Sequence, residues 1–447
     1  MQKKLTTKDY IYIASMLFGL FFGAGNLIFP VFMGQMAGNN IWYAILGFLV
    51  TGVGLPLLGI VAMGISKSNG LYSLGSRIHP YYSVFFTCAL YLTIGPFFAI
   101  PRTATVSFEV GIAPLLSADQ ISLWLGIFSF LFFISVLWFS LKPSKILVYV
   151  GKVLNPLFLF FLSILIITAF INPMGDVSQF QATGAYQDNS FFQGFIEGYN
   201  TMDALASLAF GIIVINVIKG LGVEDPKAIA VSTVKSGILS MSLMAIIYGC
   251  LAIIGTQSLG ITEISKNGGQ ALSIISTHYF GKGGAFLLAV IITLACLKTA
   301  VGLITACSET FSNMFKNSLS YKAYTVLFCT LSFAIANIGL NNIISFSIPV
   351  LMFLYPLAIS LILLSIFDGA FKGDRRVYQY TIGFTVPAAI LDLIGALPKG
   401  IVELFNLGGI IEAAKLYLPF YSIGMGWILP SISGLLIGLL ISKLSKK

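Results

Sequence analysis

GLFFGAGNLIFP, residues 19–30, interrupts an apolar stretch of the chain that begins near Tyr10. Two glycines and an asparagine, Gly23, Gly25 and Asn26, stand together about halfway along this stretch. Glycine weakens a helix, and within a membrane a backbone freed from helical hydrogen bonds is tolerated only where it faces protein or a cavity. The sequence therefore predicts a membrane helix that is broken here or, with equal weight, an intact helix that packs closely against a neighbour.

The composition of the whole chain is that of a membrane protein. Of its 447 residues, 57% are hydrophobic and 9% are charged, whereas soluble domains average about a quarter charged residues. No polar block is long enough to form a soluble domain of ~100 residues, which excludes a membrane-anchored enzyme or a receptor ectodomain. We therefore expect residues 1–447 to form a single transmembrane domain.

Twelve stretches of the chain are long and apolar enough to cross a membrane, which takes about 20 residues per helix. The predicted fold class is an all-α integral membrane protein with about twelve transmembrane helices. The stretches cover residues 10–36, 41–65, 82–112, 121–141, 146–171, 191–218, 229–254, 285–311, 323–338, 343–367, 380–397 and 421–441.

The orientation of these helices follows from the distribution of lysine and arginine, which cytoplasmic loops retain. Basic residues concentrate in both tails and in alternate loops, so we expect both termini to lie in the cytoplasm. The loops predicted to be external hold few cations, namely Lys266, Lys282, Lys399 and Lys415.

The sixth stretch is interrupted as well, by GYNTMD at residues 198–203. An unpaired aspartate inside a membrane helix costs about 2.5–3.5 kcal/mol on insertion scales, unless it lies at the membrane edge. The first and sixth stretches correspond if residues 10–171 and 191–367 form two five-helix repeats, followed by two additional helices at 380–441. An odd number of helices per repeat inverts the second repeat, and paired broken helices point to a transporter site at the midplane.

Two cations fall inside predicted spans, Arg102 in the third and Lys298 in the eighth. Each can pair structurally or extend its charge to the membrane surface. Glu109, seven residues after Arg102, is a candidate partner for a gating or structural ion pair. The sequence contains neither the G-x-x-x-x-G-K-[ST] motif of ATP-driven pumps nor the H-E-x-x-H motif of zinc enzymes, so we expect a protein that is not an enzyme.

Four long motifs stand out in the chain: residues 19–30, IGPFFAIPRTATVSFE (94–109), YNTMDALASLAFG (199–211) and LACLKTAVGLITACS (294–308). They resemble the signatures of the bacterial branched-chain amino acid:cation symporter family, and the resemblance extends over essentially the whole chain. It implies a carrier for leucine, isoleucine and valine in the bacterial cytoplasmic membrane, driven by sodium ions or protons. It also implies the five-plus-five inverted-repeat fold of the sodium-coupled amino acid transporters, with discontinuous helices 1 and 6.

An amino acid substrate needs three kinds of contact, and the two interrupted stretches can supply them. The N-terminal end of a half-helix, at Gly25 and Asn26, suits the carboxylate. Ala204, Ser207 and residues of the third and eighth stretches are candidates for an apolar pocket. Such a pocket separates side chains differing by one methylene by only about 1–3 kcal/mol, so overlapping transport of all three amino acids is expected. The ammonium group would be bound by backbone carbonyls or a carboxylate among Gly23, Ala24, Tyr199, Asn200, Thr201, Met202 and Asp203.

In the fold that the resemblance implies, a sodium ion lies between the first helix, here near Gly19 and Phe22, and the eighth, here Ala295, Lys298 and Thr299. Two adjacent hydroxyl residues usually serve in the eighth helix. In this chain one of them is Lys298, whose ammonium would supply the charge of the ion. Desolvation favours the neutral amine, so the lysine could gain and lose a proton during transport.

The lysine therefore favours proton coupling, and the alternative is sodium symport with a structural role for Lys298. Rivals of another class are a channel and a transporter-like amino acid sensor. The chain shows no rings of charge or repeated filter loops, and its predicted tails are short. No cofactor, metal other than a coupling Na⁺, nucleic acid or obligate protein partner is expected.

Overall fold

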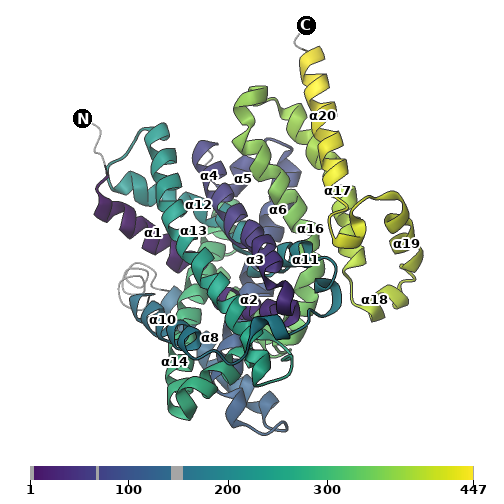
Figure 1. Cartoon of the computed structure of the whole chain (residues 1–447). Helices are drawn as coiled ribbons and strands as arrows, with labels where there is room; N and C mark the ends of the chain where they lie inside the picture. The colour runs from purple at the N-terminus through teal and green to yellow at the C-terminus, as the bar shows by residue number, and fades with distance from the viewer. Residues whose placement is uncertain (1–4, 67–69, 142–154, 446–447) are drawn as a thin grey trace.

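The computed structural model describes residues 5–66, 70–141 and 155–445. The regular elements in these ranges are helices, packed into one body from which a pair near the C-terminus projects (Figure 1). Helices before residue 172 are α1 (Thr7–Phe21), α2 (Ala24–Ala37), α3 (Ile41–Leu49), α4 (Leu55–Ile65), α5 (Leu71–Gly75), α6 (Pro80–Leu92), α7 (Ala99–Gly111), α8 (Ile121–Ser140) and α10 (Asn155–Ile171). Later helices are α11 (Ser190–Glu197), α12 (Asp203–Gly220), α13 (Pro226–Gln257), α14 (Gly268–Met314), α15 (Tyr321–Ala336), α16 (Leu340–Ile366), α17 (Arg375–Gly395), α18 (Lys399–Leu404), α19 (Gly408–Tyr417) and α20 (Ile428–Leu444).

Eleven of the twelve predicted stretches overlap one helix or successive helices over most of their length, although residues 146–154 of the fifth lie outside the described residues. The twelfth, 421–441, becomes the long helix α20 only from Ile428. In the described chain, seven helical segments are long and apolar enough to cross a membrane. An eighth is the bent pair Asp203–Gly211 and Ile213–Gly220, if it counts as one span. The all-α membrane architecture is confirmed, while the total of twelve crossings stays a prediction.

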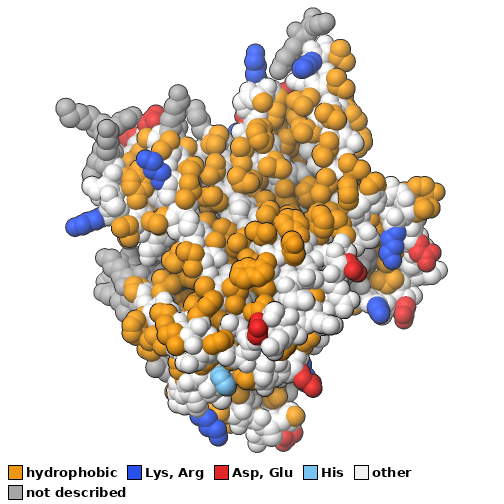
Figure 2. Space-filling view, in the orientation of Figure 1, with side chains coloured by type: hydrophobic (Ala, Val, Ile, Leu, Met, Phe, Trp, Pro, Cys, Tyr) orange, Lys and Arg blue, Asp and Glu red, His pale blue; other side chains and the backbone are white. Residues whose placement is uncertain are grey.

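The outer surface suits contact with lipid. Figure 2 shows hydrophobic side chains over the middle of one face, with charged side chains gathered toward its ends and its projecting edge. Large apolar side chains such as Trp42, Leu46 and Ile246 are more than half exposed. In water such a surface would aggregate, so the exposed apolar area indicates burial in the bilayer.

The first predicted span is broken, and the intact-helix alternative is wrong. Between α1 and α2, the backbone at Phe22 (ψ 100°) and Gly23 (φ −126°, ψ −161°) is extended. The Gly23 N–H donates a 2.9 Å hydrogen bond to Asn26 Oδ1, so the asparagine side chain replaces the missing helical partner. A Cβ atom on Gly23 would lie 3.1 Å from Thr299 Cγ2, so a glycine lets the break approach α14 closely.

The sixth predicted span is broken as well. After α11, residues Gly198–Thr201 form a 3₁₀ turn (η8), and Met202 adopts left-handed backbone angles (φ 61°, ψ 11°) before α12 begins at Asp203. A Cβ atom on Gly198 would lie 2.0 Å from Thr51 Oγ1. Glycine therefore allows the turn to lie directly against the second predicted span, which fixes the place of the break.

Glycines also bring α2 and α13 into close backbone contact. A Cβ atom on Gly34 of α2 would lie 2.0 Å from the carbonyl oxygen of Ala252, and one on Gly255 of α13 would lie 2.1 Å from that of Val31. Because the atoms that an added Cβ would meet belong to the backbone, no side-chain rotation could make room for a larger residue at either position. The half-helix α2 is thereby held against α13.

We expect Gly34→Ala to destabilise the protein by about 1–3 kcal/mol, since overpacking a close contact displaces backbone. The measurement is the midpoint of thermal unfolding in detergent. The control is Gly249→Ala in α13, where an added Cβ meets no atom within 4 Å. That change should leave the midpoint unchanged or raise it, because alanine is the better helix former; equal midpoints for the two variants would contradict the proposed close packing.

The last two predicted spans, α17 and α20, pack against each other beside α16. A Cβ atom on Gly434 of α20 would lie 2.5 Å from the carbonyl oxygen of Tyr380, and one on Gly438 would lie 2.9 Å from the Cα of Val377. This G-x-x-x-G pattern thus serves packing within the chain, and it makes the pair that projects from the body in Figure 1.

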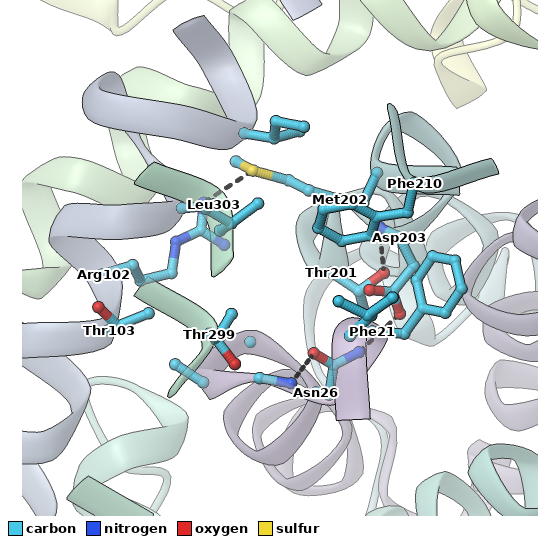
Figure 3. Close-up of a pocket in the computed structure, with 17 residues that line it drawn as sticks. Phe21, Asn26, Arg102, Thr103, Thr201, Met202, Asp203, Phe210, Thr299 and Leu303 are labelled. Atoms are coloured by element: carbon cyan, nitrogen blue, oxygen red, sulfur yellow. Dashed lines mark hydrogen bonds between the residues drawn. The ribbon is translucent and has the colours of Figure 1, made fainter. Parts of the chain in front are cut away.

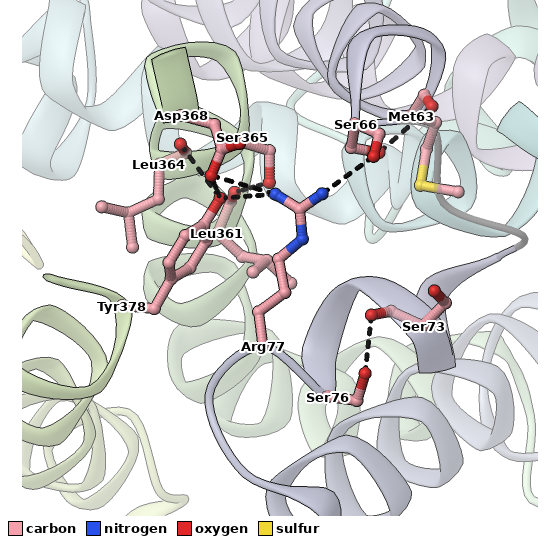
Figure 4. A network of polar contacts seen from close by, with 10 residues as sticks. All are labelled: Met63, Ser66, Ser73, Ser76, Arg77, Leu361, Leu364, Ser365, Asp368 and Tyr378. Carbon is pink, nitrogen blue, oxygen red and sulfur yellow. Dashed lines mark hydrogen bonds and ion pairs between the residues drawn. The ribbon is translucent and has the colours of Figure 1, made fainter. Parts of the chain in front are cut away.

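A polar network ties two loops together at one end of the bundle (Figure 4). Arg77 Nη1 lies 3.0 Å from Asp368 Oδ1 and donates to the Tyr378 hydroxyl at 3.0 Å, while Nη2 donates to the carbonyl of Ser66 at 2.8 Å. The charge pattern assigns the loops that carry Arg77 and Asp368 to the same side of the membrane, and their contact agrees. Which side faces the cytoplasm stays a prediction.

Candidate functional site

A small cavity of about 40 Å³ lies where the two helix breaks meet (Figure 3). The wall is built from the ends of α1 and α2, from the third predicted span, from the start of α12 and from α14. It consists of Leu20, Phe21, Gly23, Ala24, Gly25, Asn26, Ile94, Ala99, Arg102, Thr103, Thr201, Met202, Asp203, Ala206, Phe210, Thr299 and Leu303.

Two helices, α2 and α12, begin at this cavity. The first N–H groups of a helix have no partner within it, and the helix dipole adds a partial positive charge at that end. At the start of α2, Ala24 and Gly25 line the cavity. This end can therefore bind an anionic group such as a carboxylate.

Asp203, the first residue of α12, is 2% exposed and anchors a buried polar cluster. Its Oδ2 accepts hydrogen bonds from Asn26 Nδ2 at 2.6 Å and from the Tyr248 hydroxyl at 2.9 Å, and the Asn26 amide also contacts that hydroxyl. The Thr201 side chain approaches the same carboxylate. The cluster joins α2, α12 and α13, and it places a carboxylate in the cavity wall without an ion-pair partner from the described chain.

Arg102 of α7 lies in the wall as well and is 2% exposed. The guanidinium donates from Nη1 to the carbonyl of Asn200 at 2.7 Å and from Nη2 to Ser347 Oγ at 3.2 Å. It also stands over the ring of Phe29, 5.1 Å from the ring centre. Arg102 therefore connects the break of the sixth span with α2 and α16.

The ion pair predicted between Arg102 and Glu109 is not formed in this structure. Both residues are described, and no ion pair joins them within 4.0 Å. Seven residues along a helix span about 10 Å, which is too far for direct contact between these side chains once Arg102 turns toward Asn200. Glu109 instead lies beside Gly269, where a Cβ atom would be 3.2 Å from the Glu109 Cβ.

Of the residues predicted to bind substrate, seven line the cavity: Gly23, Ala24, Gly25, Asn26, Thr201, Met202 and Asp203. Tyr199 and Asn200 do not line it. The ring of Tyr199 stacks on Tyr355 with 3.9 Å between ring centres, and Asn200 presents its carbonyl to Arg102.

Ala204 and Ser207 also lie outside the wall, because α12 turns them away from it. Each residue turns a helix by about 100°, so Asp203, Ala206 and Phe210 lie within about 60° of one another around α12, whereas Ser207 lies about 100° from Ala206. The face that carries Asp203 therefore presents Ala206 and Phe210 to the cavity. Ser207 points to the second predicted span, where a Cβ atom on Gly59 would lie 1.9 Å from its Oγ.

The predicted cation region is only partly assembled at the cavity. Thr299 lines the wall beside Gly23, and its Oγ1 donates to the carbonyl of Ala295 at 3.2 Å. Lys298 is 8% exposed, outside the wall and near Cys296. Gly19 and Phe22 are buried in the last turn and at the end of α1 without lining the cavity.

Sequence reasoning missed Tyr248 and, although it assigned the third and eighth stretches to the apolar pocket, it did not identify the individual wall residues. Tyr248 stands among apolar residues of the seventh stretch, and nothing in its neighbourhood marks it as a partner of Asp203. The other missed residues carry no polar signal except Thr103. They are Leu20, Phe21, Ile94, Ala99, Thr103, Ala206, Phe210 and Leu303.

The sequence matches the family described as "Branched-chain amino acid transport protein" over residues 6–445. One curated relative is the branched-chain amino acid permease BrnQ of Lactobacillus delbrueckii subsp. lactis, 50% identical over 96% of this chain and 96% of the relative. Another is the permease BrnQ of Bacillus subtilis, 45% identical over 99% of this chain and 98% of the relative.

Two solved structures resemble the fold. Mhp1, a nucleobase-cation-symport-1 family transporter in a closed conformation, has a TM-score of 0.63 at 12% identity over 97% of this chain and 92% of its own. MhsT in complex with L-phenylalanine has a TM-score of 0.56 at 15% identity over 100% and 99%. These likenesses confirm the predicted transporter fold with discontinuous helices 1 and 6. The repeat boundaries at 10–171, 191–367 and 380–441 stay predictions.

Proposed function

The chain belongs to the branched-chain amino acid transport protein family, and from that premise we propose that it imports leucine, isoleucine and valine by cation symport. It is a multi-pass membrane transport protein and not an enzyme. One observation carries the choice of substrate: the cavity between the broken helices joins polar groups suited to a zwitterion with a largely apolar wall.

The polar groups match the two charged ends of an amino acid. Free N–H groups at the start of α2 suit the carboxylate, and Asp203 suits the ammonium group. The remaining wall includes Leu20, Phe21 and Phe210, which suit a branched aliphatic side chain. Such a wall distinguishes side chains that differ by one methylene by only about 1–3 kcal/mol, so leucine, isoleucine and valine should compete with one another.

For the coupling ion we propose a proton, and the alternative is Na⁺. Thr299 touches the break of the first span, and Lys298 is its buried neighbour in α14. A fixed positive charge about 4 Å from a bound Na⁺ would cost about 4 kcal/mol at an effective dielectric constant of about 20. An ammonium that releases and regains its proton would avoid this repulsion and could carry the coupling.

The test uses purified protein in liposomes with an imposed inward proton gradient and no sodium. We expect radiolabelled leucine to accumulate above its external concentration, isoleucine and valine to compete, and lysine and glutamate not to. Accumulation that begins only when sodium is added would reject proton coupling. Equilibration without accumulation under either gradient would favour a channel, and binding without any flux would favour a sensor.

A further inference from the structure

We propose that Arg102 binds the carboxylate of the substrate, together with the first N–H groups of α2. The inference rests on the proposed function, because it assigns one side chain of the cavity to one end of the amino acid. It gives a ligand to a buried cation that the described chain leaves without an anionic partner.

Arg102 is a buried cation. The side chain belongs to a membrane-spanning helix, is 2% exposed and has no carboxylate within 4.0 Å in the described chain. Glu197 is near enough to sense its charge but forms no ion pair with it. Buried charges in proteins are normally paired, since a charge removed from water is costly without a partner. An anion entering the cavity would supply the missing partner.

The hydrogen bonds of Arg102 leave donors unused. A guanidinium carries five N–H donors in a planar fork that fits a carboxylate. The contacts to Asn200, Ser347 and the Met202 sulfur engage only Nη1 and Nη2. Nε is buried and has no hydrogen-bond partner. The guanidinium is thus held in place from two sides and keeps donors for a further acceptor.

Arg102 lies beside the start of α2. The Asn200 carbonyl that accepts from Arg102 lies 3.5 Å from where a Cβ atom on Gly25 would be. The guanidinium and the first turn of α2 therefore share a neighbour, and both border the cavity. Two sources of positive charge converge there, as expected at a carboxylate site.

The two charged residues of the wall would also determine the orientation of a bound amino acid. Among the described residues that line the cavity, Arg102 and Asp203 are the charged ones, and they come from different helices (Figure 3). An amino acid with its carboxylate at Arg102 and its ammonium group at Asp203 would satisfy both. If Arg102 had a purely structural role and only connected the break of the sixth span to α16, binding would not require the ligand to carry a carboxylate.

The experiment compares leucine with leucinamide, which keeps the ammonium group and side chain but replaces the carboxylate with a neutral amide. Each compound is titrated against radiolabelled leucine bound to the purified full chain. The wild type should prefer leucine by at least ~30-fold, and Arg102→Gln should reduce that preference at least ~10-fold, mainly by weakening leucine. The control is Arg77→Gln, at the end of the bundle, which should keep the wild-type preference.

A preference that survives in Arg102→Gln would overturn the inference, as would an equal loss of affinity for both compounds. If that variant does not fold, Arg102→Lys decides the question, because lysine keeps the charge without the fork and should also lose at least ~10-fold of the preference. Failure of the wild type to bind leucine would reject the proposed function itself. Wild-type binding with an unchanged preference in the variants would reject only the role of Arg102.

Discussion

Replacing Asp203 with asparagine is expected to weaken leucine binding by about 10- to 150-fold and to reduce uptake in parallel. A hydrogen bond to a charged group contributes about 1.5–3 kcal/mol, and every 1.4 kcal/mol is tenfold in affinity. Asparagine has nearly the same shape, and its carbonyl oxygen can still accept from Asn26 and Tyr248, so the helix contacts should persist. The change removes the negative charge that would attract the substrate's ammonium group. The measurement is the leucine dissociation constant of the purified variant.

Tyr248→Phe is the matched control for this prediction. The tyrosine donates to the same carboxylate oxygen at 2.9 Å, but it does not line the cavity. Its loss leaves the charge of Asp203 in place and removes one supporting hydrogen bond, so a reduction of less than about tenfold is expected. Unchanged leucine affinity in Asp203→Asn, or a larger loss in Tyr248→Phe, would show that the carboxylate does not bind the ammonium group.

The sequence predicts the two helix breaks because their chemistry is local. Glycines and a capping asparagine at residues 23–26 weaken one helix, and the Asn-Thr-Met-Asp run at 200–203 weakens the other. Each of these signals lies within one short segment of the chain. It can therefore be recognised without knowing which helices pack against that segment. The membrane class is as accessible, since it depends on composition and on the length of apolar stretches.

The faces of the helices could not be predicted in the same way. The choice between Ala204 and Ala206 as a wall residue depends on the residue at which α12 begins, and a shift of one residue turns a helix by about 100°. The prediction that Glu109 pairs with Arg102 failed for a related reason. Spacing along one helix suggested Glu109, whereas packing against η8 and α16 placed Asn200 and Ser347 around the guanidinium.

The two polar clusters of the site join the two predicted repeats. Asn26 comes from the first repeat, and its partners Asp203 and Tyr248 come from the second. Arg102 of the first repeat likewise contacts Asn200 of the second. A substrate held by Asp203 and Arg102 would add its own contacts across the same boundary. Its binding energy would then favour the arrangement of repeats in which both residues face the cavity.

Replacing Lys298 with methionine is expected to abolish proton-driven accumulation of leucine while leaving exchange of leucine across the membrane intact. Methionine keeps much of the buried volume of the lysine but cannot bind a proton. With one proton per leucine, a gradient of about two pH units supports an accumulation of up to about 100-fold, because each unit is worth tenfold. Without the coupling proton, leucine should only equilibrate. The measurement is uptake into liposomes with the proton gradient, alongside counterflow from liposomes preloaded with unlabelled leucine.

Two further variants show whether the effect belongs to this position. Lys235→Met removes an exposed lysine of α13, whose amine lies 5.7 Å from the ring centre of Tyr10, and it should accumulate leucine like the wild type. Lys298→Thr places a second hydroxyl beside Thr299 and removes the fixed charge, so its accumulation should depend on sodium. Counterflow separates loss of coupling from loss of folding, since exchange requires an intact cavity but no net movement of the ion. Full proton-driven accumulation by Lys298→Met would assign the coupling to another group.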